Sequence, residues 1–194
     1  MTIAHTAKVL IGRALRPVIA GEDKLTILHR KLEPTAYELR VHSDSFALGA
    51  AIPRRHAAPG EGDNLSPELH WSTPPHGTRE LILVCEDPDA PALHPYIHWV
   101  VRRIPPALTH LPEGLAPPPD GTSGIVQATN AAGRPGWYGP LPPPGHGPHN
   151  YYFQLFALDR EVDLPAAPTQ KDLVAAMTGH VLAHGHHVGT YERR

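Results

Sequence analysis

The segment Tyr151-Tyr152-Phe153-Gln154-Leu155-Phe156-Ala157-Leu158 carries the clearest structural signal in the chain. In a strand, successive side chains point to opposite faces, and here apolar residues occupy most positions on both faces. A strand with one face in water would instead alternate apolar and polar residues. The pattern therefore predicts a central strand of a β-sandwich, covered on both sides.

Three further segments are predicted to be strands. Glu80–Glu86 is an apolar run bounded by charges, which is typical of a strand buried on both faces. Ile97–Ile104 is a second such run, and Tyr37–His42 alternates as half-buried strands do. Loops dominate residues 105–148, with a weak strand near Ile125-Val126, and a loop region this long is usually functional. The 24 prolines and 17 glycines favour short strands and turns, so the fold class is mainly β.

Helices are expected at the periphery of this β structure. Residues 6–16 and 23–32 have helical spacing of apolar residues, and a C-terminal helix is predicted over about 169–184. Thr169 and Asp172 resemble a capping box at its start, and Gly185 is the expected end. We expect residues 1–36 to form an N-terminal helical extension of a main domain over 37–194. The extension packs on that domain or on a second subunit, so a homodimer is an open expectation.

Composition excludes several classes of protein. The 194 residues suit one globular core, and a net charge of -2 without a basic stripe argues against nucleic-acid binding. No run approaches the ~20 apolar residues of a membrane span. Cys85 is the single cysteine, inside an apolar run, so we expect a buried, inert thiol and a reducing, cytoplasmic location.

Three motifs place polar groups beside the predicted strands. Asp87-Pro88-Asp89-Ala90-Pro91 follows the strand ending at Glu86 and makes a rigid turn. His98 lies in an apolar strand, where a lone histidine is more often a satisfied core residue than a ligand. Tyr138 to Tyr151 is a Pro-Gly loop that brings His146 and His149 to the start of the central strand. Taken singly, each motif is explained as well by structure as by function.

Together, in this order, the motifs resemble the phosphatidylethanolamine-binding protein family, and most closely its bacterial, Raf-kinase-inhibitor-like branch. The resemblance runs from Tyr37 to Arg194 and includes three further segments: Asn64-Leu65-Ser66-Pro67-Glu68-Leu69-His70-Trp71, Pro75-His76-Gly77-Thr78 and Gly189-Thr190-Tyr191-Glu192-Arg193. It implies a Greek-key β-sandwich with peripheral helices and a pocket for phosphate, acetate or a phospholipid headgroup. The pocket residues that it implies are Asp87, Pro91, His98, Gly145, His149 and Tyr151.

The chain departs from many relatives at Arg102-Arg103, where an asparagine is common, and at Tyr96, where some carry tryptophan. The residue types nevertheless suit an anion. Two imidazoles and a phenol supply donors for its oxygens, and Asp87 is placed to accept from a histidine and fix its tautomer. We expect anion binding to strengthen as the pH falls through the histidine range, around 6–7.

The chain holds 15 histidines, so metal binding has to be weighed. His180 and His184 would be one turn apart on the predicted last helix, a spacing that zinc sites use. No carboxylate or cysteine nearby completes a ligand set, and histidines at the negative end of a helix explain the pair more simply. No metal and no cofactor are predicted.

Three functions fit these residues. A binding module would capture a small phosphorylated or carboxylated ligand unchanged, and this is favoured because no serine lies in a nucleophile motif. An enzyme would use Asp87, His98, His149 and Tyr151 for acid–base chemistry, such as a cyclisation, isomerisation or elimination on an acidic or carbonyl substrate. A protein-interaction regulator, resembling kinase-inhibiting relatives, is the third.

Overall fold

The structure, a computed structural model, describes residues 3–32, 37–116 and 124–193. Its helices, 3-10 turns (η) and strands follow one another in this order: α1 (Ile3–Leu15), η1 (Glu22–Lys24), η2 (Thr26–Leu28), η3 (Arg30–Leu32), β1 (Tyr37–Glu38), β2 (Val41–His42), η4 (Arg54–His56), β3 (Leu69–Trp71), β4 (Glu80–Asp87), β5 (Tyr96–Ile104), β6 (His110–Leu111), β7 (Val126–Gln127), β8 (His149–Leu158), α2 (Gln170–Met177) and β9 (Val181–Tyr191).

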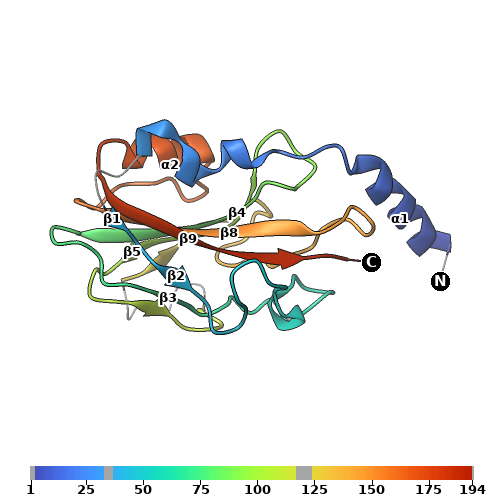
Figure 1. The fold of residues 1–194 in the computed structure, drawn as a ribbon, viewed down its shortest axis with the longest axis horizontal. Coiled ribbons are helices and arrows are strands. Elements are labelled where there is room, and N and C mark those ends of the chain that lie inside the picture. Colours follow the sequence, from blue (N-terminus) through green and yellow to red (C-terminus); the bar gives the residue numbers. More distant parts are fainter. Residues whose placement is uncertain (1–2, 33–36, 117–123, 194) are drawn as a thin grey trace.

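The strands form two sheets, with the helices at their periphery (Figure 1). The larger sheet has the order β1-β9-β8-β4-β5-β7, and the smaller has the order β2-β3-β6. β8 pairs along its length with β9 on one side and with β4 on the other, both antiparallel. The predicted central strand and the mainly β sandwich with peripheral helices are therefore confirmed.

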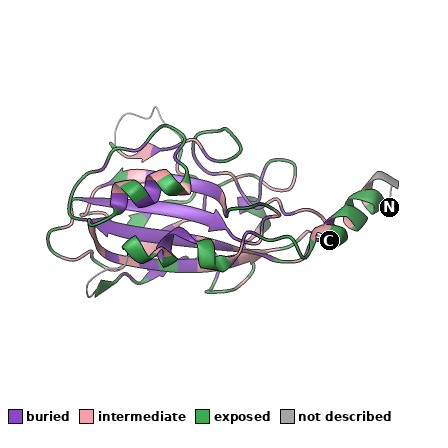
Figure 2. Cartoon of the chain, turned by 90° about the horizontal axis from the view of Figure 1, so that it is seen from above, coloured by how far each residue is buried: buried purple, intermediate pink, exposed green. Residues whose placement is uncertain are grey.

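Both faces of the larger sheet are buried, each under a different layer. Leu83 and Phe153 point toward the smaller sheet and form the core between the sheets. Ile82 and Phe156, their neighbours in or across the strands, point the other way. There they pack against Leu32, Leu173 and other apolar residues of the 3-10 turns and α2. Figure 2 shows the buried strands beneath these more exposed segments. This double cover explains why β4 and β8 have no polar face.

Residues 23–32 form 3-10 turns where the sequence predicts a single helix. The backbone N–H of Thr26 donates to Glu86 Oε2 (2.8 Å), and that of Ile27 donates to Gln154 Oε1 (2.7 Å). These two donors are therefore used by side chains of the sheet and not by helical carbonyls. Burial raises the pKa of Glu86, although hydrogen bonds from Gln154 and Thr26 oppose this effect. The segment is thus attached to the main body by buried polar bonds.

The predicted C-terminal helix is too long by about two turns, and it is not the last element. The capping box of Thr169 and Asp172 is present, but α2 ends at Met177, and Gly179 (φ 79) follows in the left-handed conformation that terminates helices. The chain then continues as β9, with Gly185 inside the strand. His180 and His184 are therefore not a helical pair, and the explanation by a helix dipole was wrong.

The predicted strand Tyr37–His42 is also divided. Tyr37 and Glu38 pair with β9 of the larger sheet, whereas Val41 and His42 pair with β3 of the smaller one. The segment therefore crosses from one sheet to the other. A single alternating sequence pattern runs through both short strands. The boundary predicted between residues 36 and 37 adjoins 33–36, which lie outside the described residues.

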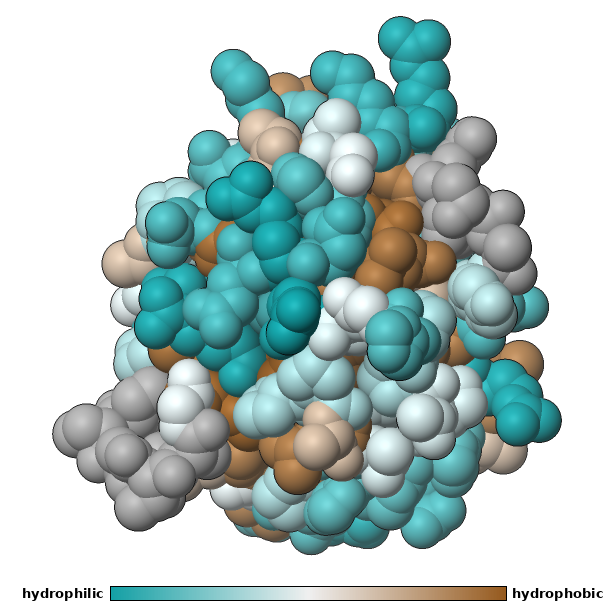
Figure 3. All heavy atoms as spheres, turned by 90° about the vertical axis from the view of Figure 1, so that its left-hand side faces the viewer, coloured by the Kyte–Doolittle hydropathy of each residue, from teal (hydrophilic) through white to brown (hydrophobic). Residues whose placement is uncertain are grey.

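The two ends of the larger sheet differ in character. At the end where β4 begins and β8 finishes, hydrophilic residues cover much of the surface and hydrophobic ones show only in separate patches (Figure 3). At the other end, α1 projects beyond the sheets close to the end of β9 (Figure 1). Among the described residues, neither α1 nor α2 has the length and apolar character that a membrane crossing requires.

Candidate functional site

Three neighbouring strands bring the candidate site together at the end of the larger sheet nearest α1. Asp87 is the last residue of β4, His98 lies near the start of β5, and His149 and Tyr151 begin β8. The antiparallel register places Asp87 opposite Tyr96 and Glu86 opposite Tyr152, so all four side chains meet at one corner. The rings of His98 and Tyr151 lie edge to face, with centroids 5.1 Å apart.

Asp87 is the centre of this cluster. Its Oδ2 accepts from His149 Nδ1 at 2.8 Å and lies 3.8 Å from His98 Nε2, while its Oδ1 accepts from the backbone N–H of Asp89. Burial of the side chain opposes ionisation, but the hydrogen bond from His149 and the nearby imidazole of His98 prevail and lower the pKa of Asp87 to about 2. The carboxylate is therefore ionised at neutral pH.

A chain of hydrogen bonds leads from Asp87 to the N-terminal helix. His149 Nε2 lies 2.8 Å from His146 Nδ1, and His146 Nε2 lies 3.0 Å from the carbonyl oxygen of Leu15. Both ends of the chain are acceptors, so its three bonds require three protons on two imidazoles. Two neutral rings carry only two protons. All three contacts can therefore be hydrogen bonds only when the pair carries one extra proton, whose charge would balance that of Asp87.

Two polar groups remain free to meet a ligand. His98 Nδ1 lies 2.5 Å from the carbonyl oxygen of Tyr138, which leaves Nε2 directed toward Asp87. Tyr151 Oη is buried and has no hydrogen-bond partner among the described residues. Burial, followed by the charge of Asp87, raises the pKa of Tyr151 well above its usual value. Its phenol is therefore a neutral donor.

The N-terminal helix is held against the loop that borders the site. Arg16 Nε donates to the carbonyl oxygen of Gly145, and Gly145 itself adopts a φ of 78, which favours glycine. Gly12 faces the loop so closely that a Cβ there would lie 2.1 Å from the carbonyl oxygen of Pro144. On the neighbouring turn, the carbonyls of Pro88 and Ala90 accept from residues just after α1.

Replacing Gly12 by alanine is expected to release α1 from this loop. The new methyl group would collide with backbone, which cannot rotate away. A free helix of 13 residues is marginal in water, so its amide protons should exchange about tenfold faster or more. Hydrogen–deuterium exchange of residues 3–15 measures this, with Ala14→Ser on the exposed face as the control. Unchanged protection in Gly12→Ala would show that the contact does not hold the helix.

The sequence-derived site residues meet here in large part. Asp87, His98, His149 and Tyr151 form one cluster, and Gly145 lies in the adjoining loop. His149 differs from its expected role, because both of its ring nitrogens are engaged by Asp87 and His146. The sequence pattern places His146 in the same loop as His149 but predicts no role for it. Its position three residues before His149, in a loop that returns to the same strand, was the available signal.

A separate cavity of about 840 Å³ lies between the 3-10 turns, the start of β5 and α2. Apolar residues such as Pro95, Ile97 and Val174 line it, with Lys31 and Lys171 among the polar ones. Tyr96 links the two regions, since it lines the cavity and its ring centroid lies 4.8 Å from that of His98. The acid–histidine cluster is thus beside this cavity and not inside it.

Comparisons with known proteins show the family of this chain. Residues 42–192 match the family model described as phosphatidylethanolamine-binding protein. A UPF0098 protein of Aquifex aeolicus is 40% identical over 156 residues, which are 80% of this chain and 89% of the relative. A UPF0098 protein of Methanothermobacter thermautotrophicus is 41% identical over 155 residues, which are 80% of this chain and 99% of that relative.

Among solved structures, E. coli YbcL, described as a new member of the mammalian PEBP family, is 33% identical with a TM-score of 0.73. That match covers 81% of this chain and all of YbcL.

Proposed function

Because this chain belongs to the phosphatidylethanolamine-binding protein family, we propose that it binds a small anion between His98 and Tyr151. One observation carries the proposal: Tyr151 Oη is buried, beside His98 and Asp87, without a partner among the described residues. A buried hydroxyl without a hydrogen bond is costly, so a position that keeps one is a candidate contact for a ligand.

The charges around Tyr151 favour the binding of one small anion. An extra proton on the histidine pair would balance the charge of Asp87, so that the carboxylate would not leave the corner with a net negative charge. His98 Nε2, when protonated, adds a charged donor on the other side of the phenol. The family name points to a phosphate-bearing headgroup, and free phosphate or a carboxylate offers the same oxygen acceptors. We therefore propose binding without chemical change to the ligand.

Tyr151→Phe tests the proposal. Removing the hydroxyl takes away one hydrogen bond to a charged oxygen, so affinity for inorganic phosphate should fall about tenfold or more. Isothermal titration calorimetry with phosphate, phosphoethanolamine and acetate gives the affinities and separates the sources: tighter phosphoethanolamine indicates a headgroup, and equal affinities indicate phosphate alone. Repeating the phosphate titration between about pH 5.5 and 8 tests whether protonation strengthens binding.

Tyr152→Phe is the matched control, because the same atom is removed from the next residue of β8. Tyr152 Oη faces away from the site and donates to Glu22 Oε1 at 2.8 Å. Its loss should leave phosphate affinity unchanged. Equal affinities in wild type and Tyr151→Phe, or no heat of binding for any of the three anions, would refute an anion site at this position.

A further inference from the structure

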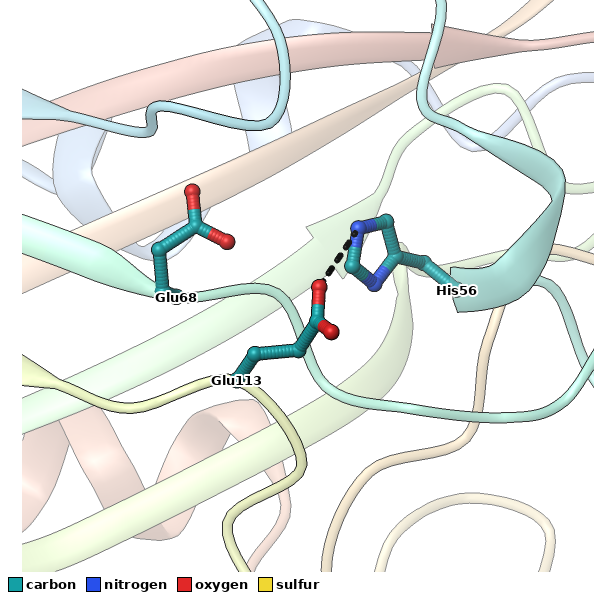
Figure 4. Close-up of side chains that lie close together, drawn as sticks. All are labelled: His56, Glu68 and Glu113. Carbon is teal, nitrogen blue, oxygen red and sulfur yellow. Dashed lines mark ion pairs between the residues drawn. The ribbon is translucent and has the colours of Figure 1, made fainter.

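A second cluster of ligating groups lies in a different part of the molecule. His56 belongs to η4, Glu68 directly precedes β3, and Glu113 follows β6. β3 and β6 pair with Leu69 opposite Leu111, which places the two carboxylates at the same end of the small sheet. Nitrogen and oxygen atoms of the three side chains lie within 4.8 Å of one another (Figure 4).

His56 presents an unused nitrogen to the two carboxylates. Its Nδ1 lies 2.9 Å from the carbonyl oxygen of Leu65, and this bond requires the proton on Nδ1. The side chain is 0% exposed, and Nε2 has no hydrogen-bond partner among the described residues. Burial lowers the pKa of His56, which favours the neutral ring. The free lone pair of Nε2 therefore points at acceptor groups, an arrangement that is unfavourable without a cation.

Glu68 is fixed and ionised. Its Oε1 accepts from Ser43 Oγ and the backbone N–H of Ser45, and its Oε2 accepts from Ser45 Oγ at 2.6 Å. Burial opposes ionisation, but these hydrogen bonds prevail and lower the pKa of Glu68 to about 2. Oε2 receives a single donor, so it keeps lone-pair capacity for a further partner.

Glu113 supplies the opening to solvent. Its side chain is 38% exposed, and Oε2 lies 3.7 Å from His56 Nε2 and 2.8 Å from Arg55 Nε. The first distance is too long for a hydrogen bond. Two ligands on one tetrahedral ion, each about 2.1 Å from it, lie about 3.4 Å apart. His56 and Glu113 are close to this spacing, and the whole cluster, whose atoms lie within 4.8 Å of one another, has to contract around an ion.

We propose that His56 Nε2, Glu68 and Glu113 bind one divalent transition-metal ion such as Zn²⁺, with solvent in the open position. One imidazole, held by a backbone carbonyl through its other nitrogen, together with two carboxylates is a ligand set suited to zinc and its neighbours. The two carboxylates supply the negative charge that the ion needs. Arg55, which now pairs with Glu113 and reaches Ser45 Oγ, competes with the ion for the same carboxylate.

The site goes beyond the proposed anion binding, although one loop borders both regions. Trp137 Nε1 donates to the carbonyl oxygen of His56, and the next residue, Tyr138, accepts from His98. The metal site uses no side chain of the anion site. A negative result at one site therefore leaves the other proposal unaffected.

Zinc titration of the untagged, EDTA-treated full chain tests the proposal by isothermal titration calorimetry. Wild type should bind one Zn²⁺. The affinity should fall at least about tenfold in both His56→Gln and Glu113→Gln. Glu113 is partly exposed, so that variant stays folded even if the buried His56 variant does not. Arg55→Gln should bind Zn²⁺ about tenfold more tightly, because a competing positive charge has been removed.

His110→Ala is the control for the other histidines. His42, His70 and His110 stack across the small sheet, with ring centroids 5.2 and 5.8 Å apart, and they are another group of histidines that added zinc can reach. The control should keep the wild-type affinity of the proposed site. The assignment would be overturned if wild type bound no Zn²⁺, or if Glu113→Gln bound it with the same affinity as wild type.

Discussion

Gly185→Ala is expected to lower the free energy of unfolding by about 3 kcal/mol, because a Cβ at this position collides with backbone. It would lie 1.7 Å from the carbonyl oxygen of Leu39, at the point where the chain leaves β1. The backbone N–H of Leu39 donates to His184 at 2.9 Å, so the two segments are too closely bonded to separate. A chain of this length should lose roughly 6–12 °C in Tm.

Thermal unfolding followed by circular dichroism measures this loss. His186→Ala, an exposed change on the neighbouring residue of β9, serves as the control and should shift Tm by little. A Gly185→Ala protein with the Tm of wild type would mean that the edge formed by β1 and residue 39 moves aside at low cost. In that case the close approach would not be what requires glycine here.

Asp87→Asn is expected to cost about 2 kcal/mol of stability at neutral pH. A carboxyl group whose pKa falls from 3.8 to about 2 on folding contributes roughly this amount once it is ionised. Asparagine can still accept the hydrogen bond from His149, but it removes the charge that balances the histidine pair. Denaturant unfolding at pH 7 measures the loss as a shift of the midpoint.

The pH dependence of this loss has a defined sign. Because the pKa of Asp87 is lower in the folded state, its contribution is present above the unfolded value and disappears as the pH falls toward about 2. The difference in the free energy of unfolding between wild type and Asp87→Asn should therefore shrink as the pH falls below about 4.

Asp159→Asn provides the matched control, because Asp159 also pairs with a histidine. Its Oδ1 lies 2.9 Å from His180 Nδ1, but the two side chains are 46% and 32% exposed. An exposed pair of this kind contributes about 0–1 kcal/mol. Equal losses in Asp87→Asn and Asp159→Asn would show that burial of the Asp87 pair adds nothing to its strength.

Local patterns were sufficient where a segment has one environment along its whole length. β4 and β8 are apolar on both faces, and the structure covers both faces. The turn after Glu86 and the loop before Tyr151 adjoin these strands, but it was the family resemblance that grouped Asp87, His149 and Tyr151 in one pocket. The capping box of Thr169 and Asp172 needs only neighbouring residues, and it too was predicted correctly.

The sequence by itself therefore determined the mainly β fold and the central strands, and its resemblance to a known family indicated most of the polar cluster at their ends. Only the tertiary structure decided the rest, because it depends on partners distant in the chain. β9 is a strand because β8 offers it a row of hydrogen bonds, and residues 23–32 form 3-10 turns in which the N–H groups of Thr26 and Ile27 donate to Glu86 and Gln154. The chain of contacts through His149 and His146 ends on a carbonyl of α1, 131 residues before His146. Likewise, His56 meets Glu113 only once the small sheet has formed, so no local pattern could reveal that cluster.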